Sequence, residues 1–510
     1  MTAPAAAPSR AAATSLVVRG LLLPLVAGAA CVFGFAPFHA WIVPMLALAV
    51  LFHAWTGSGS ALQAALTGFA FGLGYFLAGV SWVYVSLHVY GAMPAVLAAV
   101  ATFLFCAYLA LFPALAGAIA WRLARRARWR LLAATPASFV LMEWLRGWLF
   151  TGFPWLNLGT SQAPASPVAG FAPVVGAYGV SLAVAGVAAL CVALISSAAW
   201  SRNRFALLGG LVAIFAVGGA LRLVEWTVPA GAPVTMALLQ GNVPQNLKFR
   251  DETRAKTLID YREMIRNANA RVVVLPETAL PAFLDRLPPG YLDELRAHAL
   301  EAKKDILLGA LERTVSGDRF AYYNSVVRLG DGAPQSFRKR HLVPFGEFIP
   351  WGFRWVLDIL HIPLTDFSRG EATQPPLLAA GTAFGVTVCY EDIFGEELVT
   401  QLPEAKILLN VSNTAWFGES LASDQHLQSS QMRSLEMGRW STRATNTGVT
   451  AVVDERGRVV SRLPQFTSGT LVESVVPRSG ATPFVHGGNV PALLIAVAML
   501  AVAAWRRRPA

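Results

Sequence analysis

Long apolar stretches separated by short polar loops dominate the chain up to about residue 225, and one more apolar stretch stands near its end. A helix that crosses the apolar core of a bilayer needs about 20 mostly apolar residues. Eight stretches approach or exceed that length: residues 17 to 35, 41 to 56, 62 to 86, 92 to 121, 132 to 150, 174 to 199, 205 to 225 and 489 to 505. The pattern predicts a multi-pass helical membrane domain, residues 17 to 228, and a C-terminal transmembrane helix, residues 489 to 505.

The start of the chain allows two interpretations. Residues 1 to 16 are rich in Ala and Pro and are predicted to be disordered. The small residues Ala27 to Ala30 follow the first apolar run, as they do in a cleaved signal peptide. Arg19 within the run, and the immediate continuation into further apolar stretches, favour a retained anchor. Both alternatives leave the later topology unchanged.

Residues 232 to 478 show a different pattern, in which short β-branched and apolar runs alternate with longer runs of helical periodicity. The predicted strands are residues 234 to 239, 271 to 275, 306 to 310, 323 to 328, 384 to 388, 407 to 411, 448 to 453 and 470 to 475. The predicted helices are residues 251 to 269, 291 to 304 and 426 to 445. This alternation is typical of an α/β domain, and the region is long enough to bury its own core.

Composition and charge support a membrane protein and suggest its orientation. The chain of 510 residues is 55% hydrophobic and 14% charged, and its mean hydropathy is +0.51. Much of the net charge of +11 comes from arginines in loops beside apolar stretches: Arg122, Arg125, Arg126, Arg128, Arg130, Arg202, Arg204 and Arg506 to Arg508. The positive-inside rule explains this clustering, so the charge does not indicate nucleic-acid binding. With a cytoplasmic N-terminus these loops are all cytoplasmic, and residues 232 to 478 lie outside.

Cys389 is the one cysteine of residues 232 to 478, and it stands where a predicted strand ends and an acidic, helix-prone run begins. The positive end of a helix would favour the thiolate form, which is the nucleophile. Glu391 and Asp392 would oppose that effect, so a nearby cation would have to help. A buried cysteine that acts as a small hydrophobic residue is an equally good interpretation of this stretch alone.

Three further polar clusters lie in this region, where α/β domains usually place their sites after strands. Glu277 follows a buried strand, where loss of water would suit it to act as a general base. Lys339 lies in a basic triplet that runs into an apolar loop ending at Glu347. Trp416 and Phe417 follow another strand. Taken singly, a surface glutamate, a solvated basic face and core aromatic residues explain these clusters as well.

Taken together, the chain resembles the apolipoprotein N-acyltransferases, the membrane-anchored members of the nitrilase superfamily. The likeness covers nearly the whole chain, and a glutamate, a lysine and a cysteine in that order are its centre. The segments that carry it are residues 33 to 38, 79 to 86, 240 to 245, 275 to 279, 341 to 347, 367 to 370, 389 to 391 and 412 to 418. The resemblance implies an α-β-β-α sandwich for the nitrilase-like domain, joined to about eight transmembrane helices.

The resemblance also implies roles for individual residues. Cys389 corresponds to the nucleophile, Glu277 to the general base, and Lys339 to the cation that stabilises the oxyanion. Glu347, Tyr390 and Glu391 correspond to supporting residues of the site. Trp416 and Phe417 are possible substrate-lining residues, as is Phe249, which stands where the family often has tryptophan. Phenylalanine keeps the aromatic face but lacks the indole N–H donor.

The implied activity is transfer of a fatty acyl chain from phospholipid, through a cysteine thioester, to the N-terminal amine of a diacylglyceryl-cysteine lipoprotein. The implied partners are the phospholipid, the lipoprotein and the bilayer, and the implied location is the bacterial inner membrane with the catalytic domain on the periplasmic face. No cofactor is expected. The eight histidines show no metal-ligand spacing, so no metal site is expected either.

Two alternatives remain open from the sequence. A membrane-tethered amidohydrolase of the nitrilase type would let water resolve the thioester. A transporter or scaffold with an inactive domain would need no reactive cysteine. The apolar stretches hold few charged groups of the kind that an ion pathway needs. Glu143 and Arg146 are exceptions, and at this spacing on a helix they are expected simply to pair.

Overall fold

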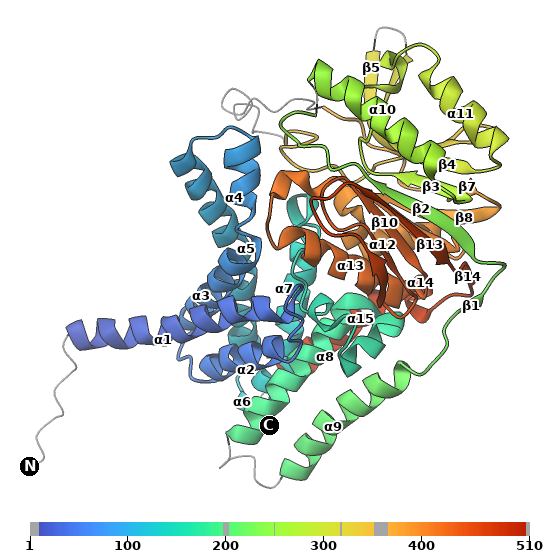
Figure 1. Cartoon of the computed structure of the whole chain (residues 1–510). Coiled ribbons are helices and arrows are strands. Elements are labelled where there is room, and N and C mark those ends of the chain that lie inside the picture. Colours follow the sequence, from blue (N-terminus) through green and yellow to red (C-terminus); the bar gives the residue numbers. More distant parts are fainter. Residues whose placement is uncertain (1–9, 197–202, 249, 317–318, 351–365, 506–510) are drawn as a thin grey trace, which may run out of the picture.

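The computed structural model describes residues 10–196, 203–248, 250–316, 319–350 and 366–505, and it has two parts (Figure 1). The helical part comprises residues 10–221 and 490–505, and the sheet part comprises residues 228–479. In Figure 1 the helices of the helical part lie below and to the left of the sheets.

Each of the eight predicted apolar stretches contains a helix. These are α1 (Arg10–Ala30), α2 (Val43–Thr56), α3 (Ala61–Val80), α5 (Ala95–Leu123), α7 (Thr135–Arg146), α8 (Ala172–Ile195), α9 (Arg204–Leu221) and α15 (Val490–Trp505). Among the described residues, 4 helices are long and apolar enough to cross a membrane, namely α3, α5, α8 and α9. Helices α1, α2 and α15 contribute shorter apolar segments, and α7, which carries Glu143 and Arg146, has 12 residues.

The predicted disorder of residues 1 to 16 is wrong for its second half. Helix α1 begins at Arg10, and residues 1–9 lie outside the described part of the chain. The run Ala11–Ala12–Ala13 explains the early start, because alanine has the highest helix propensity of all residues.

Two six-stranded sheets form the centre of the sheet part, and each predicted strand of residues 232 to 478 has a counterpart in them. The first sheet has the order β13 (Gly469–Val475), β2 (Val234–Gln240), β3 (Val272–Leu275), β4 (Asp305–Ser316), β5 (Arg319–Leu329), β6 (Gln335–Arg338). The second has the order β12 (Val459–Arg462), β11 (Ala451–Val453), β10 (Ser441–Thr445), β9 (Ile407–Ser412), β8 (Thr382–Val388), β7 (Leu377–Ala379). A short pair, β1 (Val228–Pro229) with β14 (Arg478–Ser479), lies near the ends of this part.

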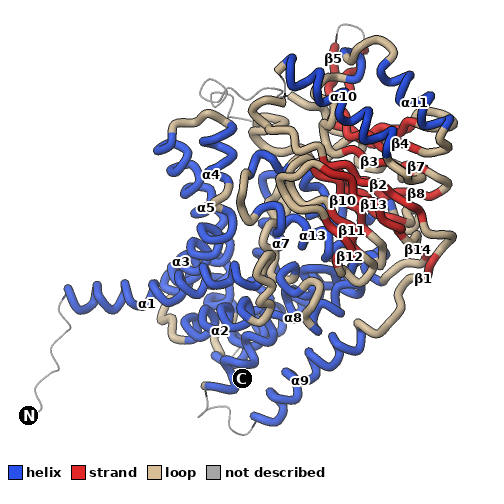
Figure 2. Tube along the Cα trace, viewed as in Figure 1, coloured by secondary structure: helices blue, strands red, loops and turns tan. Residues whose placement is uncertain are grey.

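The two sheets pack face to face and helices cover their outer faces (Figure 2). Buried apolar residues from both sheets, such as Val274 and Val386, form one core between them. Helices α10 (Asp251–Asn267) and α11 (Tyr291–Glu301) cover the first sheet, and α10 does so through Leu258, Tyr261 and Ile265, which share one helical face. Helix α13 (Ala422–Met437) covers the second sheet. The layers are therefore α, β, β and α.

The helix predicted over residues 426 to 445 is wrong in its second half. Helix α13 ends at Met437, because Gly438 adopts the left-handed conformation (φ +59°) and donates its N–H to the carbonyl of Ser434. The chain then enters β10, where the β-branched Thr442 and Thr445 fit a strand better than a helix. The short strands β6, β7, β10 and β12 were also absent from the prediction, because runs of three to five residues carry little periodicity.

Helix α13 also joins the sheet part to the helical part. Its Met432 and Leu435 share a core with residues of α8. The side chain of Gln428 accepts a hydrogen bond from the Ala36 N–H at 2.8 Å, and Gln425 accepts one from Trp155 Nε1 at 2.7 Å. Helix α13, which covers the second sheet, is therefore also packed against and hydrogen-bonded to residues of the predicted membrane domain.

Candidate active site

Glu277, Lys339 and Cys389 each lie just after a strand, and the structure brings the three together. Glu277 follows β3, Lys339 follows β6 and Cys389 follows β8. The three side chains are close enough for their charges to interact. Because β3 and β6 belong to one sheet and β8 to the other, the site forms where the ends of both sheets meet.

Glu277 is held by two hydrogen bonds and is 7% exposed. Its Oε1 accepts from the Asn324 side-chain amide at 2.7 Å, and its Oε2 accepts from the Asn413 backbone N–H at 2.8 Å. Both bonds fix the position of the carboxylate, and a carboxylate can act as a general base.

Lys339 is fully buried and carries the positive charge of the site. Its Nζ lies 2.8 Å from Glu347 Oε2 and 3.8 Å from Glu277 Oε1. Burial alone would lower the pKa of Lys339, but the charges of Glu347 and Glu277, joined by that of Cys389 when its thiol is ionised, outweigh burial and raise the pKa. The side chain therefore stays an ammonium group, which can stabilise an oxyanion.

Of the two interpretations of the Cys389 stretch, a helix-stabilised thiolate and a buried thiol, the electrostatics of the site favour the buried thiol. Burial, reinforced by Glu277 and only partly opposed by Lys339, raises the pKa of Cys389 to about 12. The helix after it is a five-residue 3₁₀ turn, Cys389–Ile393, followed by α12 (Gly395–Leu398) with four residues. Elements this short carry too small a dipole to outweigh burial. The thiol therefore needs a base, and Glu277 is the carboxylate beside it.

Glu347, Tyr390 and Glu391 form a shell around these three residues. Glu347 accepts from the Val343 N–H at 2.8 Å and from Asn324 at 2.9 Å. The Tyr390 hydroxyl donates to the Leu342 carbonyl at 2.9 Å, and its ring centre lies 5.5 Å from Lys339 Nζ. Both residues therefore fix the loop that follows Lys339.

Glu391 links the two halves of the site through three backbone N–H groups. Its Oε1 accepts from Arg340 at 2.8 Å and from His341 at 2.9 Å, and its Oε2 accepts from Val388 at 2.8 Å. Burial raises the pKa of Glu391 to about 7, against the effect of these donors and of Lys339. Glu391 thus ties the backbone next to Lys339 to the strand end next to Cys389.

The expected lining residues lie at the junction of the two parts, as far as they are described. Phe249 lies outside the described residues. Trp416 accepts a hydrogen bond from Ser86 Oγ at 2.8 Å through its backbone carbonyl. The ring of Phe417 packs edge to face on Trp82, with 4.5 Å between ring centres. Both aromatic residues therefore face the helical part.

Asn324 and Lys248 belong to the site although neither was singled out as a site residue from the sequence. The amide of Asn324 bridges Glu277 and Glu347, and its Oδ1 is buried without a hydrogen-bond partner. Lys248 is 2% exposed, and burial lowers its pKa to about 8 although Glu277 acts in the opposite direction. An asparagine within a strand carries no recognisable signal, whereas Lys248 stands beside Phe249, which the resemblance did indicate.

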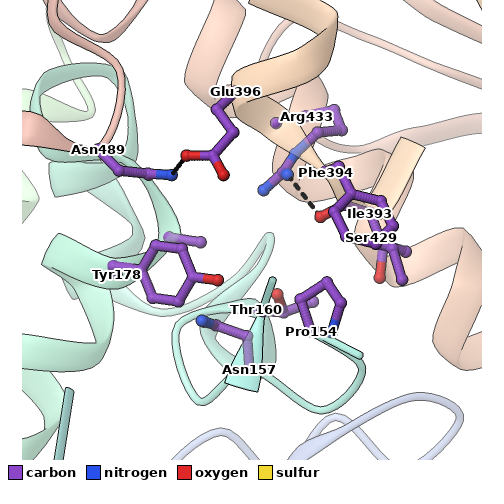
Figure 3. A pocket seen from close by; sticks show the side chains of 13 residues that line it. Pro154, Asn157, Thr160, Tyr178, Ile393, Phe394, Glu396, Ser429, Arg433 and Asn489 are labelled. Carbon is purple, nitrogen blue, oxygen red and sulfur yellow. Dashed lines mark hydrogen bonds between the residues drawn. The ribbon is translucent and has the colours of Figure 1, made fainter. Parts of the chain in front are cut away.

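A separate pocket lies at the junction and is lined in part by residues 393–396, which follow Cys389 in the chain (Figure 3). Tyr178 and Asn157 line it from the helical part, and Glu396 and Arg433 line it from the sheet part. Arg433 donates to the Ile393 carbonyl at 3.1 Å, and Asn489 donates to Glu396 at 2.7 Å. None of Glu277, Lys339 and Cys389 lines this pocket.

Among the described residues, no group of three or more His, Cys, Asp or Glu side chains is placed to hold a metal ion.

Two models of known protein families match this chain. Residues 235–483 match the model of the carbon-nitrogen hydrolase family, which defines the class of the sheet part. Residues 27–190 match the model described as apolipoprotein N-acyltransferase N-terminal domain.

Whole-length relatives carry the name of the same family. An apolipoprotein N-acyltransferase of Nitrosomonas europaea is 48% identical over 96% of this chain and 98% of its own length. Relatives with the same name from Methylococcus capsulatus and Ralstonia nicotianae are each 45% identical, over 96% and 93% of this chain and over 97% and 91% of their own lengths. The chain therefore belongs to the apolipoprotein N-acyltransferase family.

Proposed function

We propose that this protein transfers a fatty acyl chain from a membrane phospholipid to the N-terminal amine of a diacylglyceryl-cysteine lipoprotein through a thioester on Cys389. The observation that carries the proposal is the buried meeting of Glu277, Lys339 and Cys389 at the junction with an apolar helical part. The relatives are named for N-acylation of apolipoproteins, which favours this function over a membrane-tethered amidohydrolase.

In the first half of the reaction Glu277 takes the proton of the Cys389 thiol, and the sulfur attacks the ester carbonyl of the phospholipid. A carbon–sulfur bond forms, and the negative charge on the carbonyl oxygen is stabilised by the Lys339 ammonium group. The ester carbon–oxygen bond then breaks, and the proton held by Glu277 passes to the leaving alcohol oxygen. The lysophospholipid departs and the acyl chain stays on Cys389.

In the second half an unprotonated amine attacks the thioester carbonyl. A carbon–nitrogen bond forms, Glu277 takes one proton from the amine nitrogen, and Lys339 again stabilises the oxyanion. The carbon–sulfur bond breaks, and the proton on Glu277 returns to the sulfur. The site is then in its starting state, so one thioester serves a donor and an acceptor in turn.

A test of this function uses phospholipid labelled in an acyl chain, the full-length protein in lipid nanodiscs, and the Cys389→Ala variant. We expect the wild-type protein to acquire label that hydroxylamine releases, and Cys389→Ala to acquire none. Cys389→Ala protein that is labelled like the wild type would contradict the proposal.

We further propose that all eight helices cross the inner membrane and that the sheet part lies on the periplasmic side. The turns that this topology puts outside contact the sheet part, since Ala36 bonds to Gln428, Ser86 to Trp416 and Thr151 to His341. The turn at Ser58, which this topology places on the cytoplasmic side, instead accepts a hydrogen bond from Trp121 of the helical part through the Ser58 carbonyl. The arginine-rich loops fall on the inner side.

Topology can be tested with single cysteines in a background where Cys31, Cys106, Cys191 and Cys389 are all serine. A cysteine at Ser60, which is exposed, should react with a membrane-impermeant maleimide only after the inner membrane is opened. A cysteine at Ser474, on the exposed face of β13, should react in intact spheroplasts. The reverse pattern would contradict the orientation.

Trp416 and Phe417 are proposed to line the path of the acyl chain. They lie at the junction, where an acyl chain that leaves the bilayer has to pass to reach Cys389, and their aromatic faces suit an apolar chain. Phe249, which lies outside the described residues, is proposed to line the same path, because the family resemblance points to an aromatic residue at this position.

A further inference from the structure

The backbone of Cys389 is strained. Its φ angle is +57°, in the left-handed region that residues other than glycine rarely adopt. Such a conformation persists only where the surroundings hold it, and it is commonly found where a side chain must be presented for a reaction. The groups that hold Cys389 therefore bear directly on how its sulfur is presented.

Two side chains hold the backbone close to Cys389, one before it and one after it in the chain. Glu391 accepts from the Val388 N–H at 2.8 Å on one side. On the other side the side-chain amide of Asn410 donates to the Cys389 carbonyl at 2.8 Å, and it donates also to Thr387 Oγ1 at 3.0 Å. Asn410 lies on β9, next to the strand that ends at Cys389.

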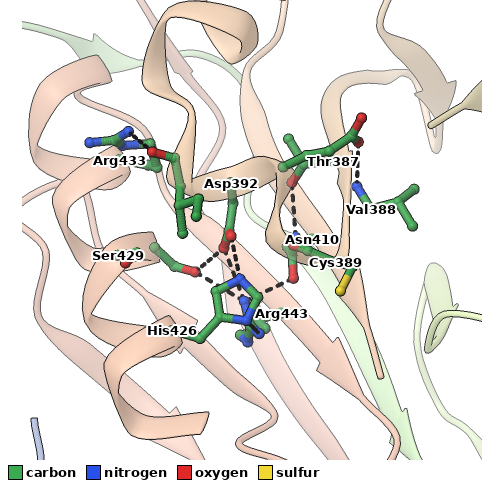
Figure 4. A network of polar contacts seen from close by, with 12 residues as sticks. Thr387, Val388, Cys389, Asp392, Asn410, His426, Ser429, Arg433 and Arg443 are labelled. Carbon is green, nitrogen blue, oxygen red and sulfur yellow. Dashed lines mark hydrogen bonds and ion pairs between the residues drawn. The ribbon is translucent and has the colours of Figure 1, made fainter. Parts of the chain in front are cut away.

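Asn410 is itself held by a buried cluster of polar side chains (Figure 4). Arg443 on β10 donates from Nη1 to Asn410 Oδ1 at 2.9 Å and to Asp392 Oδ2 at 3.0 Å. This bond fixes the amide orientation of Asn410, because its oxygen must face Arg443 and its nitrogen must face the Cys389 carbonyl. Arg443 and Asn410 are each 1% exposed.

His426 and Ser430 of α13 complete the cluster. Burial and Arg443 lower the pKa of His426 although Asp392 opposes them, so its ring is neutral. In this form Nδ1 accepts from Arg443 Nη2 at 2.6 Å, and Nε2–H donates to Asp392. Ser430 donates to the other oxygen of Asp392. The charges of Arg443 and Asp392 cancel, so the cluster adds no net charge beside the thiol.

Helix α13 is in turn held by the helical part. Gln425, next to His426, accepts from Trp155 Nε1 at 2.7 Å and donates to the Gly79 carbonyl at 3.1 Å. The rings of Trp155 and His426 also lie 5.3 Å apart, measured between their centres. A continuous set of contacts thus runs from the helical part through α13, Arg443 and Asn410 to the Cys389 carbonyl.

We propose that Asn410, oriented by Arg443, Asp392 and His426, is a positioning residue that holds the strained Cys389 backbone so that the sulfur meets the ester carbonyl. This inference rests on the proposed role of Cys389 as the nucleophile. It assigns the buried cluster a part in the rate of acylation, separate from its part in stability.

The Asn410→Asp variant separates these two parts. The carboxylate keeps the size of the amide and still accepts from Arg443, but it cannot donate to the Cys389 carbonyl. Single-turnover acylation by labelled phospholipid should become about tenfold to a hundredfold slower, as expected when a reacting group is misplaced. The apparent KM for phospholipid should stay close to the wild-type value, while the thermal midpoint should fall moderately, because the buried Cys389 carbonyl loses its donor. Asn410→Ala, which also lacks the donor, should slow acylation of the folded enzyme to a similar extent.

Thr387→Val is the matched control. It removes the other acceptor of the Asn410 amide but leaves the bond to the Cys389 carbonyl, so it should lower the thermal midpoint while acylation of the folded enzyme stays within about twofold. Acylation at the wild-type rate in Asn410→Asp would overturn the positioning role. The positioning role would also be overturned if the acylation rate of both Asn410 variants fell only in proportion to the folded fraction, or if the whole effect were an increase in KM. Cys389→Ala, measured alongside, fails differently, because a labelled Cys389→Ala protein would defeat the proposed function itself.

Discussion

Two buried sets of charged side chains, one in each part of the molecule, are built in opposite ways. In the helical part Glu143 accepts from the Leu158 N–H at 2.7 Å, and Arg146 donates to the carbonyls of Phe153 and Trp155. The two side chains are 4.0 Å apart, so the pairing expected from their spacing is present but weak. Their main contacts are with the loop that follows α7.

In the sheet part Lys339 makes its ion pairs with side-chain carboxylates, not with carbonyls of the backbone. Glu277 and Glu347 share this one cation, and a thiol lies beside them. The carboxylates outnumber the ammonium group, and the buried Asn324 Oδ1 has no partner. Glu143 and Arg146 bond mainly to backbone groups, so they stabilise a loop. The site around Lys339 has more carboxylates than cations and a buried acceptor without a partner, so it can take up a proton or bind a substrate.

Removal of the base should have the largest effect on activity. In Glu277→Gln the side chain no longer accepts the thiol proton, so acylation should fall by about a hundredfold to ten thousandfold. The amide still accepts one of the two hydrogen bonds of Glu277, so the free energy of unfolding should change by no more than about 2 kcal/mol. Single-turnover acylation and thermal unfolding of the same samples measure the two effects. A variant that keeps its activity would show that another group removes the proton.

Removal of the buried carboxylate of the helical part, Glu143, should lower stability and leave the rate of acylation nearly unchanged. Glu143→Ala leaves Arg146 buried without its carboxylate and the Leu158 N–H without an acceptor. Loss of one member of a buried ion pair costs about 3–5 kcal/mol. The thermal midpoint in nanodiscs should therefore fall clearly, while acylation per folded molecule stays within about threefold. A rate that collapses in fully folded Glu143→Ala would remove the distinction between the two sets.

The pKa of Cys389 gives a prediction about pH. The pKa of the Cys389 thiol is raised to about 12, so at any lower pH the thiolate fraction increases about tenfold for each unit by which the pH rises. Alkylation of Cys389 by iodoacetamide, followed by mass spectrometry of its peptide, should therefore accelerate from pH 7 to about pH 10 without a plateau. A plateau below about pH 9 would mean that Lys339 outweighs burial and Glu277.

The smallest expected effect concerns the junction. Phe417→Ala removes a ring that packs on Trp82 and is proposed to line the acyl path. The KM for phospholipid should rise about threefold to tenfold, since an aromatic contact of this kind contributes about 0.5–1.5 kcal/mol. Single-turnover acylation at saturating phospholipid should stay near the wild-type rate. Phe417→Leu is the matched control and should recover most of the affinity. An unchanged KM in Phe417→Ala would limit Phe417 to packing.

The sequence was most informative where residues carry a pattern or a family likeness. The predicted strands ending before Glu277 and Cys389 are present, and the structure brings both residues together with Lys339. Asn324, Asn410 and Arg443 went unnoticed, because a polar residue inside a strand looks the same whether it bonds to solvent or to a buried partner. Their roles depend on contacts between strands far apart in the chain. Such contacts also decided that residues 441–445 form a strand, although the local pattern had favoured a helix.

The central claim is that one thioester at Cys389 serves both the donor and the acceptor. The most direct measurement loads the protein with a labelled acyl chain from phospholipid, removes free lipid, and then adds a diacylglyceryl-cysteine peptide with a free N-terminal amine. We predict that the label leaves Cys389 at least as fast as steady-state turnover and appears as an amide on the peptide, in an amount equal to the loaded enzyme. Label that stays on the enzyme, or that is released as free fatty acid while the peptide remains unlabelled, would contradict the account.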